Sequence, residues 1–401
     1  MTSDRFPRNW VIVAGGFHDT GAMDRANAAL ARHLLDRGAR VHLVGHDIDD
    51  RFTQHPKADC HVVPRPRAAA PLAESLLSRR GIAVASEVTA VCPDARVVVN
   101  GGNCPWPDIN WVHAVHAGWT VVDDGAPAWV KVKHRAVKAL ARRQERTALG
   151  AARTIITNSH ATRQALLEAG LVDTPSRVHV VYLGSDPTWG SPDARERASA
   201  RALYQIPAHQ PVVAYVGTLG FDLNKGFDVL WSAWERMAQS GTWNATLLAA
   251  GDGGRLPFWR RAAERAGVEE RVKFLGQTSR VRDLLAAADL LVSPVRYEAY
   301  GLNVHEALCR GAAVMVTSTA GVVERFDQDL EPSLLPSRVT AELLQARLRD
   351  WSADVEGWRT RARSTAVRLR ARSWDDMARD VVAAALQTAD AHAADGASRA
   401  L

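Results

Sequence analysis

Cysteine is scarce in this sequence, and it has no long apolar runs. The 401 residues include four cysteines, Cys60, Cys92, Cys104 and Cys309, and no two of them have C-x-x-C spacing. A disulfide framework and a zinc site are therefore not expected. No apolar run approaches the roughly 20 residues that a membrane-spanning helix needs, and residues 1–8 lack the apolar core of a signal peptide. We therefore expect a cytoplasmic protein.

Nucleic-acid-binding signatures and short internal repeats are also missing. The formal charge of +6 and the pI of about 9.4 permit attraction to acidic partners such as nucleotides or anionic lipids. Arginines on solvated helix faces would give the same total, so the charge alone selects no partner. We expect no nucleic acid partner. The length fits two domains, at roughly 100–200 residues for each domain.

Apolar runs alternate with helical stretches along both halves of the chain. Residues 10–14 form a predicted strand that enters a glycine-rich loop, followed by a helix over 22–37 and a strand over 39–45. The same pattern restarts at residue 211. Such β-α alternation with short connections predicts an α/β fold of two doubly wound parallel sheets that face each other across a cleft. The predicted parts are an N-terminal domain (1–186), a linker (187–208), a C-terminal domain (209–372) and a terminal helix (373–401).

Two carboxylates, Glu298 and Glu306, bracket a glycine that follows a strand and opens a helix. A helix that begins after Gly301 directs its first N–H groups and its dipole outward, so the amides near Leu302 and Asn303 favour a phosphate. The carboxylates would accept hydrogen bonds from sugar or ribose hydroxyls. The alternative is that Glu298 only caps the helix and Glu306 is a solvated helix residue.

Two further positions suit phosphate. Lys225 stands in a loop before a helix, where a cation can neutralise a phosphate or can be an ordinary surface lysine. Gly21, just before the first helix, either lets the backbone approach a phosphate or is a plain turn glycine.

Residues 100–108 are rich in glycine and proline and follow a strand, at the sheet edge where open α/β folds form sites. This places Asn100, Asn103 and Trp106 at a candidate site. His113 and His116 lie three apart on a strand predicted over 109–115, so they point to opposite faces and are poor partners for one metal ion. His116, where the strand runs into glycine, is either a structural histidine or a site residue.

A long basic helix is predicted over residues 129–150. Its cationic stripe consists of Lys131, Arg135, Lys138, Arg142 and Arg146. Such a stripe could lie on an anionic membrane surface. The favoured interpretation is a solvated outer face with Glu145 turned inward.

Several short motifs of the second half occur together. They are Gly217 with Lys225 and Gly226, Gly251-Asp-Gly253, Val272-Lys-Phe-Leu-Gly276, Asp289-Leu-Leu-Val-Ser-Pro294, Glu298 with Glu306, Gly311-Ala-Ala-Val and Gly321-Val-Val-Glu324. In this combination the chain resembles the retaining glycosyltransferases of family 4, which have the GT-B fold. The first half is similar to the acceptor domain of that family at Gly21-Ala-Met-Asp-Arg25, Thr157-Asn-Ser159 and Gly184-Ser-Asp186. Ser373-Trp-Asp375 resembles the start of the terminal helix that returns to the first domain.

The resemblance implies transfer of a hexose from a nucleotide sugar, a UDP- or GDP-sugar, to a small-molecule or lipid-linked acceptor. By resemblance, Glu306 binds the ribose, Glu298 the sugar hydroxyls and Lys225 the diphosphate, and His116 lies beside the donor sugar. Gly21, Thr218, Gly251, Gly301, Leu302 and Asn303 complete the expected donor side, and Asn100, Asn103, Trp106 and His113 the acceptor side. No cofactor and no metal ion are expected.

Two positions depart from the family pattern. Thr218 stands where an arginine is common, and Ala22 where a second loop glycine is common. No carboxylate of the first half is well placed as a nucleophile, so front-face attack is the working hypothesis. The alternatives are a sugar phosphorylase, a nucleotide-sugar epimerase, or a catalytically silent sugar- or membrane-binding module.

Overall fold

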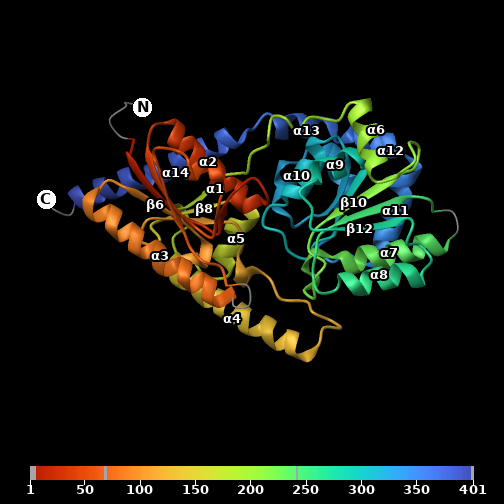
Figure 1. The fold of residues 1–401 in the computed structure, drawn as a ribbon, viewed down its shortest axis with the longest axis horizontal. Helices are drawn as coiled ribbons and strands as arrows, with labels where there is room; N and C mark the ends of the chain where they lie inside the picture. Colours follow the sequence, from red (N-terminus) through yellow and green to blue (C-terminus); the bar gives the residue numbers. More distant parts are fainter. Residues whose placement is uncertain (1–5, 67–69, 241–242, 399–401) are drawn as a thin grey trace. The chain divides into compact units, whose positions relative to one another are not determined.

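The structure is a computed structural model that describes residues 6–66, 70–240 and 243–398 (Figure 1). It divides into two compact units. Unit 1 consists of Met1–Gly118, Arg135–Gly184 and Ser373–Leu401, and unit 2 of Trp119–His134 and Ser185–Arg372.

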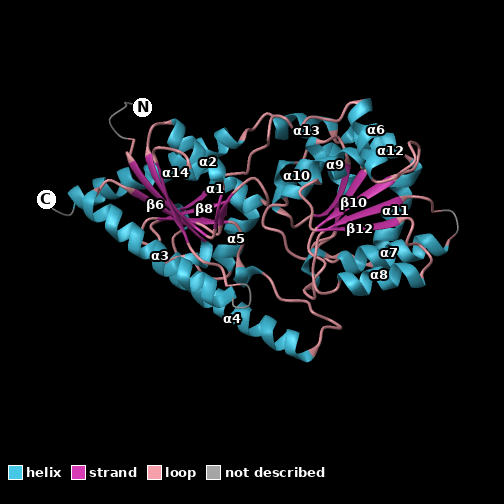
Figure 2. Ribbon diagram, in the orientation of Figure 1, coloured by secondary structure: helices cyan, strands magenta, loops and turns pink. Residues whose placement is uncertain are grey.

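Unit 1 is built on a seven-stranded parallel sheet with the order β5-β3-β1-β6-β7-β8-β9 (Figure 2). The strands are β1 (Asn9–Val13), β3 (Arg40–Gly45), β5 (Ala58–Val62), β6 (Arg96–Asn100), β7 (Ile109–Val112), β8 (Thr154–Thr157) and β9 (Val178–Val180), and a small second sheet pairs β2 (Gly16–Phe17) with β4 (Asp47–Ile48). The central strands are valine- and isoleucine-rich and almost fully buried, as expected for a sheet covered on both faces.

Helices cover both faces of this sheet. They are α1 (Ala22–Asp36), α2 (Asp50–Thr53), α3 (Ala70–Val91), α4 (Ala128–Ala151, in this unit from Arg135 onward), α5 (His160–Glu168) and α14 (Trp374–Ser398). Val11 and Val13 pack toward α3, while α1 and α14 pack against each other on the opposite face. The ring of His33 on α1 lies 2.6 Å from the carboxylate of Asp375 on α14. The terminal helix is therefore held beside the first helix of the chain.

The strand expected over residues 109–115 is shorter than predicted. β7 ends at Val112, and His116 opens the short 3-10 helix η3 (His116–Gly118). The carboxylate of Glu145, buried on α4, accepts the backbone N–H groups of His116 and Ala117 at 2.8 and 3.1 Å. The chain turns here because these amides bond to a side chain instead of a neighbouring strand.

Unit 2 contains a six-stranded parallel sheet with the order β12-β11-β10-β13-β14-β15. The strands are β10 (Val212–Val216), β11 (Thr246–Ala250), β12 (Val272–Gly276), β13 (Leu290–Ser293), β14 (Ala313–Thr317) and β15 (Leu334–Leu335). The helices are α6 (Ala194–Leu203), α7 (Phe227–Gln239), α8 (Leu256–Arg265), α9 (Val281–Ala287), α10 (Leu302–Cys309), α11 (Ala341–Ala353), α12 (Val355–Arg361) and α13 (Arg363–Arg370). A tryptophan-rich core joins one face of the sheet to α7, α8, α11 and α12. Outside this core, α9 contacts β10, and α10 contacts β13 and β14.

The segment predicted as the linker, 187–208, contains the helix α6. Arg197 and Arg201 on this helix form ion pairs with Asp289, and the same carboxylate accepts the backbone N–H of Val212 at 2.8 Å. Glu196 pairs at 2.6 Å with Arg310, which is 1% exposed. These contacts hold the segment against unit 2.

The predicted fold class is confirmed by the two parallel sheets, each with helices on both faces. Among the described residues, no helix has the length and apolar character needed to cross a membrane.

Candidate active site

The turn between β13 and α10 holds Gly301 in a left-handed conformation, with φ 100°. A Cβ at this position would lie 3.2 Å from the side chain of Val322 and 3.4 Å from that of Glu298, so glycine suits both the backbone and the space. No side chain caps α10, which begins at Leu302. Its first-turn amides, including that of Asn303, therefore form an open N-terminus of the kind that binds anions.

Lys225 and Glu298 meet beside this turn. Their Nζ and Oε2 atoms are 2.6 Å apart, with side chains 32% and 18% exposed. The pair joins two loops that a second hydrogen bond also connects, because the side-chain amide of Asn224 donates to the carbonyl of Tyr297 at 3.1 Å. Gly226, which follows Lys225, has φ 72°, and a Cβ there would lie 2.0 Å from the carbonyl oxygen of Pro294. Close backbone packing thus places the cation next to the carboxylate.

The loops after β10 and β11 lie against each other through two glycines. Gly217 donates to the carbonyl of Ala250 at 3.0 Å, and a Cβ on Gly251 (φ 142°) would lie 1.8 Å from the carbonyl oxygen of Gly217. The hydroxyl of Tyr215 donates to the carbonyl of Thr218 at 3.2 Å. Burial raises the pKa of Tyr215 well above its usual value, so it stays a neutral donor. The side chain of Thr218 is exposed beside this loop.

Two predicted donor-side residues lie on α10 itself. Glu306 is 9% exposed, so its carboxylate is not the solvated helix residue of the alternative interpretation. Asn303 donates its side-chain amide to the carbonyl of Val216 at 3.0 Å, which fixes α10 against the end of β10. The structure therefore groups the predicted unit 2 residues at the carboxyl ends of β10, β11 and β13, where doubly wound sheets bind ligands.

Sequence reasoning missed a buried chain of polar groups behind this turn. The hydroxyl of Tyr300 lies 2.8 Å from Nδ1 of His305, whose Nε2 lies 2.5 Å from the hydroxyl of Ser185. Ser185 donates to the carbonyl of Leu369 at 2.7 Å. These hydrogen-bonded groups link Tyr300, next to the turn, to α10 and to Ser185. They are up to 184 positions apart in the sequence, so no local pattern predicts their meeting.

In unit 1, His116 lies on η3, held by Glu145 as described above. Burial lowers the pKa of its imidazole, and the nearby cations Lys138 and Arg142 lower that pKa further. The ring is therefore neutral near pH 7. A neutral imidazole can accept one hydrogen bond and donate another.

The predicted acceptor-side residues follow β6 and β7, and most are held by packing. Asn100 is 2% exposed and donates to the carbonyl of Trp111 at 3.5 Å. The ring of His113 lies 4.6 Å from that of Trp111, and burial lowers its pKa to about 3. Trp106 packs half-buried against the core below α3. Asn103 ends a 3-10 turn and is half-buried.

Gly21 stands directly before α1, with φ 81° and no side-chain cap on the helix. Asp24 in the first turn lies 3.6 Å from the ring of His18. Burial, the largest effect, raises the pKa of the Asp24 carboxyl. Gly21 thus opens an uncapped helix N-terminus in unit 1.

Comparison with known proteins matches both halves of the chain. A family model described as Glycosyltransferase Family 4 matches residues 23–189, and one described as Glycosyl transferases group 1 matches residues 210–350. The two matches together span most of the sequence. The chain therefore belongs to the glycosyltransferases of family 4, as its motifs indicated.

Individual relatives match a smaller part of the chain than the two family models together. The 2-deoxystreptamine N-acetyl-D-glucosaminyltransferase of Streptomyces fradiae is 29% identical over 235 residues, which is 56% of this chain and 52% of the relative. The D-inositol 3-phosphate glycosyltransferase of Mycolicibacterium smegmatis is 30% identical over 174 residues, which is 42% of this chain and 38% of the relative. The chain thus spans about half the length, or less, of the curated relatives it matches.

Solved structures match nearly the whole chain. WaaG, a glycosyltransferase involved in lipopolysaccharide biosynthesis, has a TM-score of 0.72 and 19% identity, over 93% of this chain and 98% of its own. HepE of Anabaena, solved with UDP and glucose, has a TM-score of 0.65 and 19% identity, over 97% of this chain and 100% of its own. These likenesses establish the GT-B fold.

Proposed function

We propose that this protein transfers a hexose from a nucleotide sugar to an acceptor hydroxyl and retains the anomeric configuration. The observation that carries the proposal is the ion pair of Lys225 and Glu298 beside the uncapped N-terminus of α10. This arrangement offers a positive charge for the diphosphate and, beside it, a carboxylate that can accept hydrogen bonds from the sugar hydroxyls. Family membership and the UDP-containing likeness to HepE support a UDP-sugar as the donor.

Each group has a distinct role in the proposed donor complex. The diphosphate lies against Lys225 and the amides that follow Gly301. Glu298 accepts hydrogen bonds from the sugar hydroxyls, and the buried carboxylate of Glu306 accepts them from the ribose. Thr218 brings no positive charge, so in this proposal the diphosphate depends on Lys225 and on backbone amides.

In the proposed reaction the bond between the anomeric carbon and the diphosphate oxygen breaks, and its electron pair leaves with the diphosphate. The acceptor oxygen forms its bond to the anomeric carbon on the same face, and its proton passes to the departing diphosphate. Negative charge grows on the diphosphate as the bond breaks. Lys225 and the α10 amides therefore stabilise the transition state more than the ground state. We propose that this charge takes the role that a metal ion has in other transferases.

The proposal is tested by a thermal-shift screen of the purified chain against UDP- and GDP-sugars, followed by donor hydrolysis and transfer assays. A ligand bound only by the native state raises its melting temperature. Glu306→Gln should abolish the shift by the active donor, whereas Glu269→Gln, an exposed glutamate of the same unit, should keep it. A chain that no nucleotide sugar shifts, and that releases no nucleotide, would contradict the proposal. Conversion of the donor sugar into its epimer, without any acceptor alcohol, would favour an epimerase.

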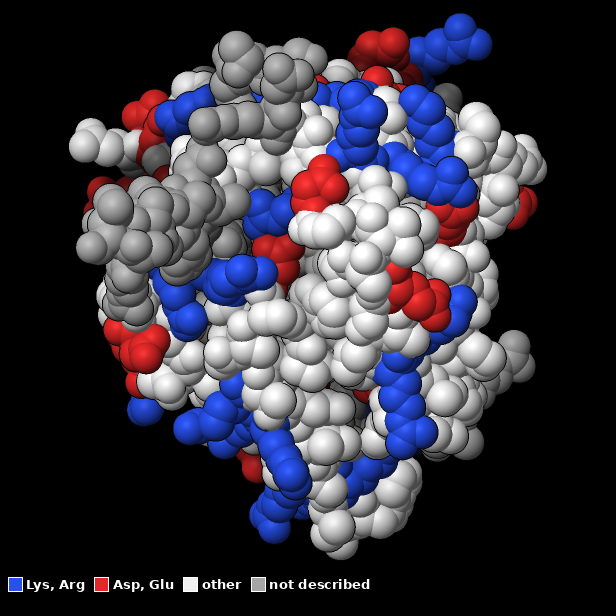
Figure 3. All heavy atoms as spheres, turned by 90° about the vertical axis from the view of Figure 1, so that its left-hand side faces the viewer, with Lys and Arg blue, Asp and Glu red and all other residues white. Residues whose placement is uncertain are grey.

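We also propose peripheral contact between the first half of α4 and the anionic inner face of a membrane. Trp129 and Val132 are 68% and 64% exposed on this helix, and Lys133 and Arg135 are exposed beside them. Exposed aromatic and aliphatic groups among cations are typical of helices that lie in the lipid interface. Lys and Arg side chains also gather in the lower part of the face drawn in Figure 3.

A further inference from the structure

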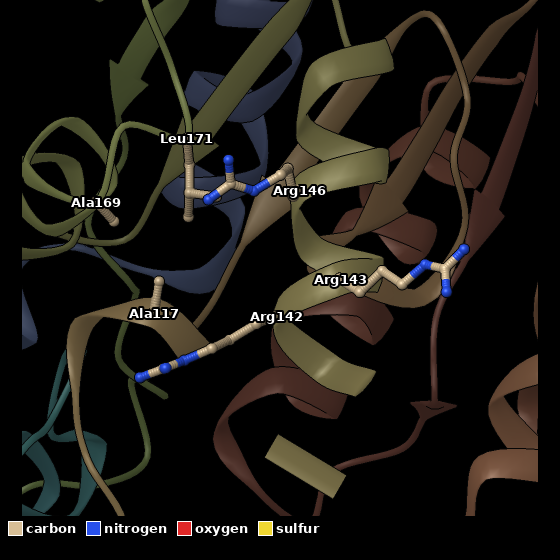
Figure 4. A pocket seen from close by; sticks show the side chains of 6 residues that line it. All are labelled: Ala117, Arg142, Arg143, Arg146, Ala169 and Leu171. Carbon is tan, nitrogen blue, oxygen red and sulfur yellow. The ribbon is translucent and has the colours of Figure 1, made fainter. Parts of the chain in front are cut away.

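A pocket of about 460 Å³ opens in unit 1, beside α4 (Figure 4). Its lining consists of Ala117, Arg142, Arg143, Arg146, Ala169 and Leu171. Apart from the arginines, the side chains that line the pocket are thus apolar. An apolar wall strengthens the attraction between a guanidinium and an anion because it lowers the local dielectric constant.

The arginines of this pocket do not all face the same way. Arg142 and Arg146 are four positions apart on α4, so they share one face of the helix. Figure 4 shows both guanidinium groups directed to the side where Ala117 and Leu171 lie, whereas the guanidinium of Arg143 extends to the other side of the helix. Two like charges at this spacing repel each other by roughly 0.2–0.5 kcal/mol. The structure therefore gathers positive charge at the pocket at a small cost in stability.

The carboxylate that α4 itself could offer these arginines is already used. Glu145 accepts the amides of His116 and Ala117. Within the described part of the chain, no hydrogen bond or ion pair engages the guanidinium of Arg146. Arg142 donates through Nε to the carbonyl of His116 at 3.4 Å, and its guanidinium is directed to the side of Ala117.

The pocket adjoins the residue that the proposed function places beside the donor sugar. Ala117 follows His116 on η3, and Arg142 bonds to the carbonyl of His116, so pocket and imidazole share one short segment. A molecule whose charged end lies in the pocket would extend toward His116. We propose that the acceptor is anionic and that its phosphate or carboxylate group binds between Arg142 and Arg146. This inference rests on the proposed function, because it names the class of acceptor for that reaction.

Guanidinium groups suit both kinds of anion, since their N–H groups form a planar fork that matches two oxygens of a phosphate or carboxylate. A hydrogen bond to a charged group contributes about 1.5–3 kcal/mol, and about 1.4 kcal/mol is tenfold in affinity. Loss of either arginine should therefore weaken anion binding by about tenfold or more.

The test uses the full chain saturated with UDP, so that the proposed diphosphate site is occupied, and inorganic phosphate as the titrant in calorimetry. Arg142→Gln and Arg146→Gln should each raise the dissociation constant for phosphate about tenfold or more. Arg79→Gln, at an exposed arginine on α3 of the same unit, is the matched control, because it removes an equal charge outside the pocket, and should change that constant by less than about twofold. Equal affinity in wild type and both pocket variants, or an equal loss in Arg79→Gln, would overturn the proposal.

The source of the anion is distinguished with sugar probes. Glucose 6-phosphate and glucuronate are compared with neutral glucose, whose dissociation constant should not depend on Arg146. Arg146→Lys keeps the charge but loses the fork and should bind phosphate between wild type and Arg146→Gln. The variants' melting temperatures show that each is folded. Failure of the proposed function appears separately, as absence of UDP binding in wild type, and phosphate titration without UDP then still tests the pocket.

Discussion

The ammonium group of Lys225 lies 2.6 Å from the carboxylate of Glu298, although 73 positions separate the two residues in the sequence. Each residue holds the other at the turn that opens α10. In the proposed donor complex both change partners, because the lysine moves its charge to the diphosphate and the glutamate receives sugar hydroxyls. The two groups are thus already in place before the donor arrives, which reduces the cost of ordering them.

Replacement of Lys225 by methionine should lower activity far more than stability. The ion pair is partly exposed, so its loss should change the free energy of unfolding by no more than about 1 kcal/mol. Loss of one transition-state donor typically lowers turnover about 100-fold or more. Donor turnover and urea denaturation measure the two effects. Lys133→Met, an exposed lysine elsewhere, serves as the control. Full turnover in Lys225→Met would remove the lysine from the proposed chemistry.

Gly301→Ala should destabilise the fold and weaken donor binding together. A left-handed conformation costs a residue with a Cβ roughly 1–2 kcal/mol, and that Cβ would lie 3.2 Å from Val322. Gly150→Ala is the matched control, since a Cβ there meets nothing within 4 Å. Gly150 lies inside α4, where alanine should stabilise by up to about 1 kcal/mol. Urea midpoints of the two variants should therefore move in opposite directions.

Mild acid should destabilise the protein through His113. Burial lowers its pKa to about 3 in the folded chain, against roughly 6.5 when unfolded. Between these values the unfolded chain binds the additional proton, so the free energy of unfolding falls as the pH falls from roughly 6.5 toward 3. His113→Phe keeps an aromatic ring beside Trp111 and should flatten this dependence in urea titrations at pH 7 and pH 5. His209→Gln, at an exposed histidine, should leave the slope as in wild type.

Trp129→Ala combined with Val132→Ala should weaken binding to vesicles of phosphatidylglycerol. Both side chains are more than half exposed, so their removal should scarcely alter the melting temperature. Flotation with anionic vesicles, neutral phosphatidylcholine vesicles and added salt separates the apolar and electrostatic contributions. Leu72→Ala, at another exposed apolar side chain on α3, is the control. Wild-type chain that stays unbound in every mixture would rule out membrane contact by α4.

The amino-acid sequence by itself determined the alternation of strands and helices and the glycine that opens α10. These features depend on local chemistry, because side-chain periodicity and the φ angle of a glycine are properties of short segments. The two parallel sheets and the position of Glu298 and Glu306 around one turn were therefore predictable. The family was predictable for the same reason, since its motifs are short.

Tertiary structure decided the features that join distant segments. β7 stops at Val112 because Glu145, on a later helix, takes the amides of His116 and Ala117. The roles of Asn103, Trp106 and the other acceptor-side residues remain predictions, although the structure shows how packing holds these side chains.

The basic stripe of α4 looks uniform in the sequence. Arg142 and Arg146 line a pocket only because η3 and the segment at Leu171 fold against that helix. A pocket needs surfaces from more than one segment, so the sequence of α4 alone does not predict it.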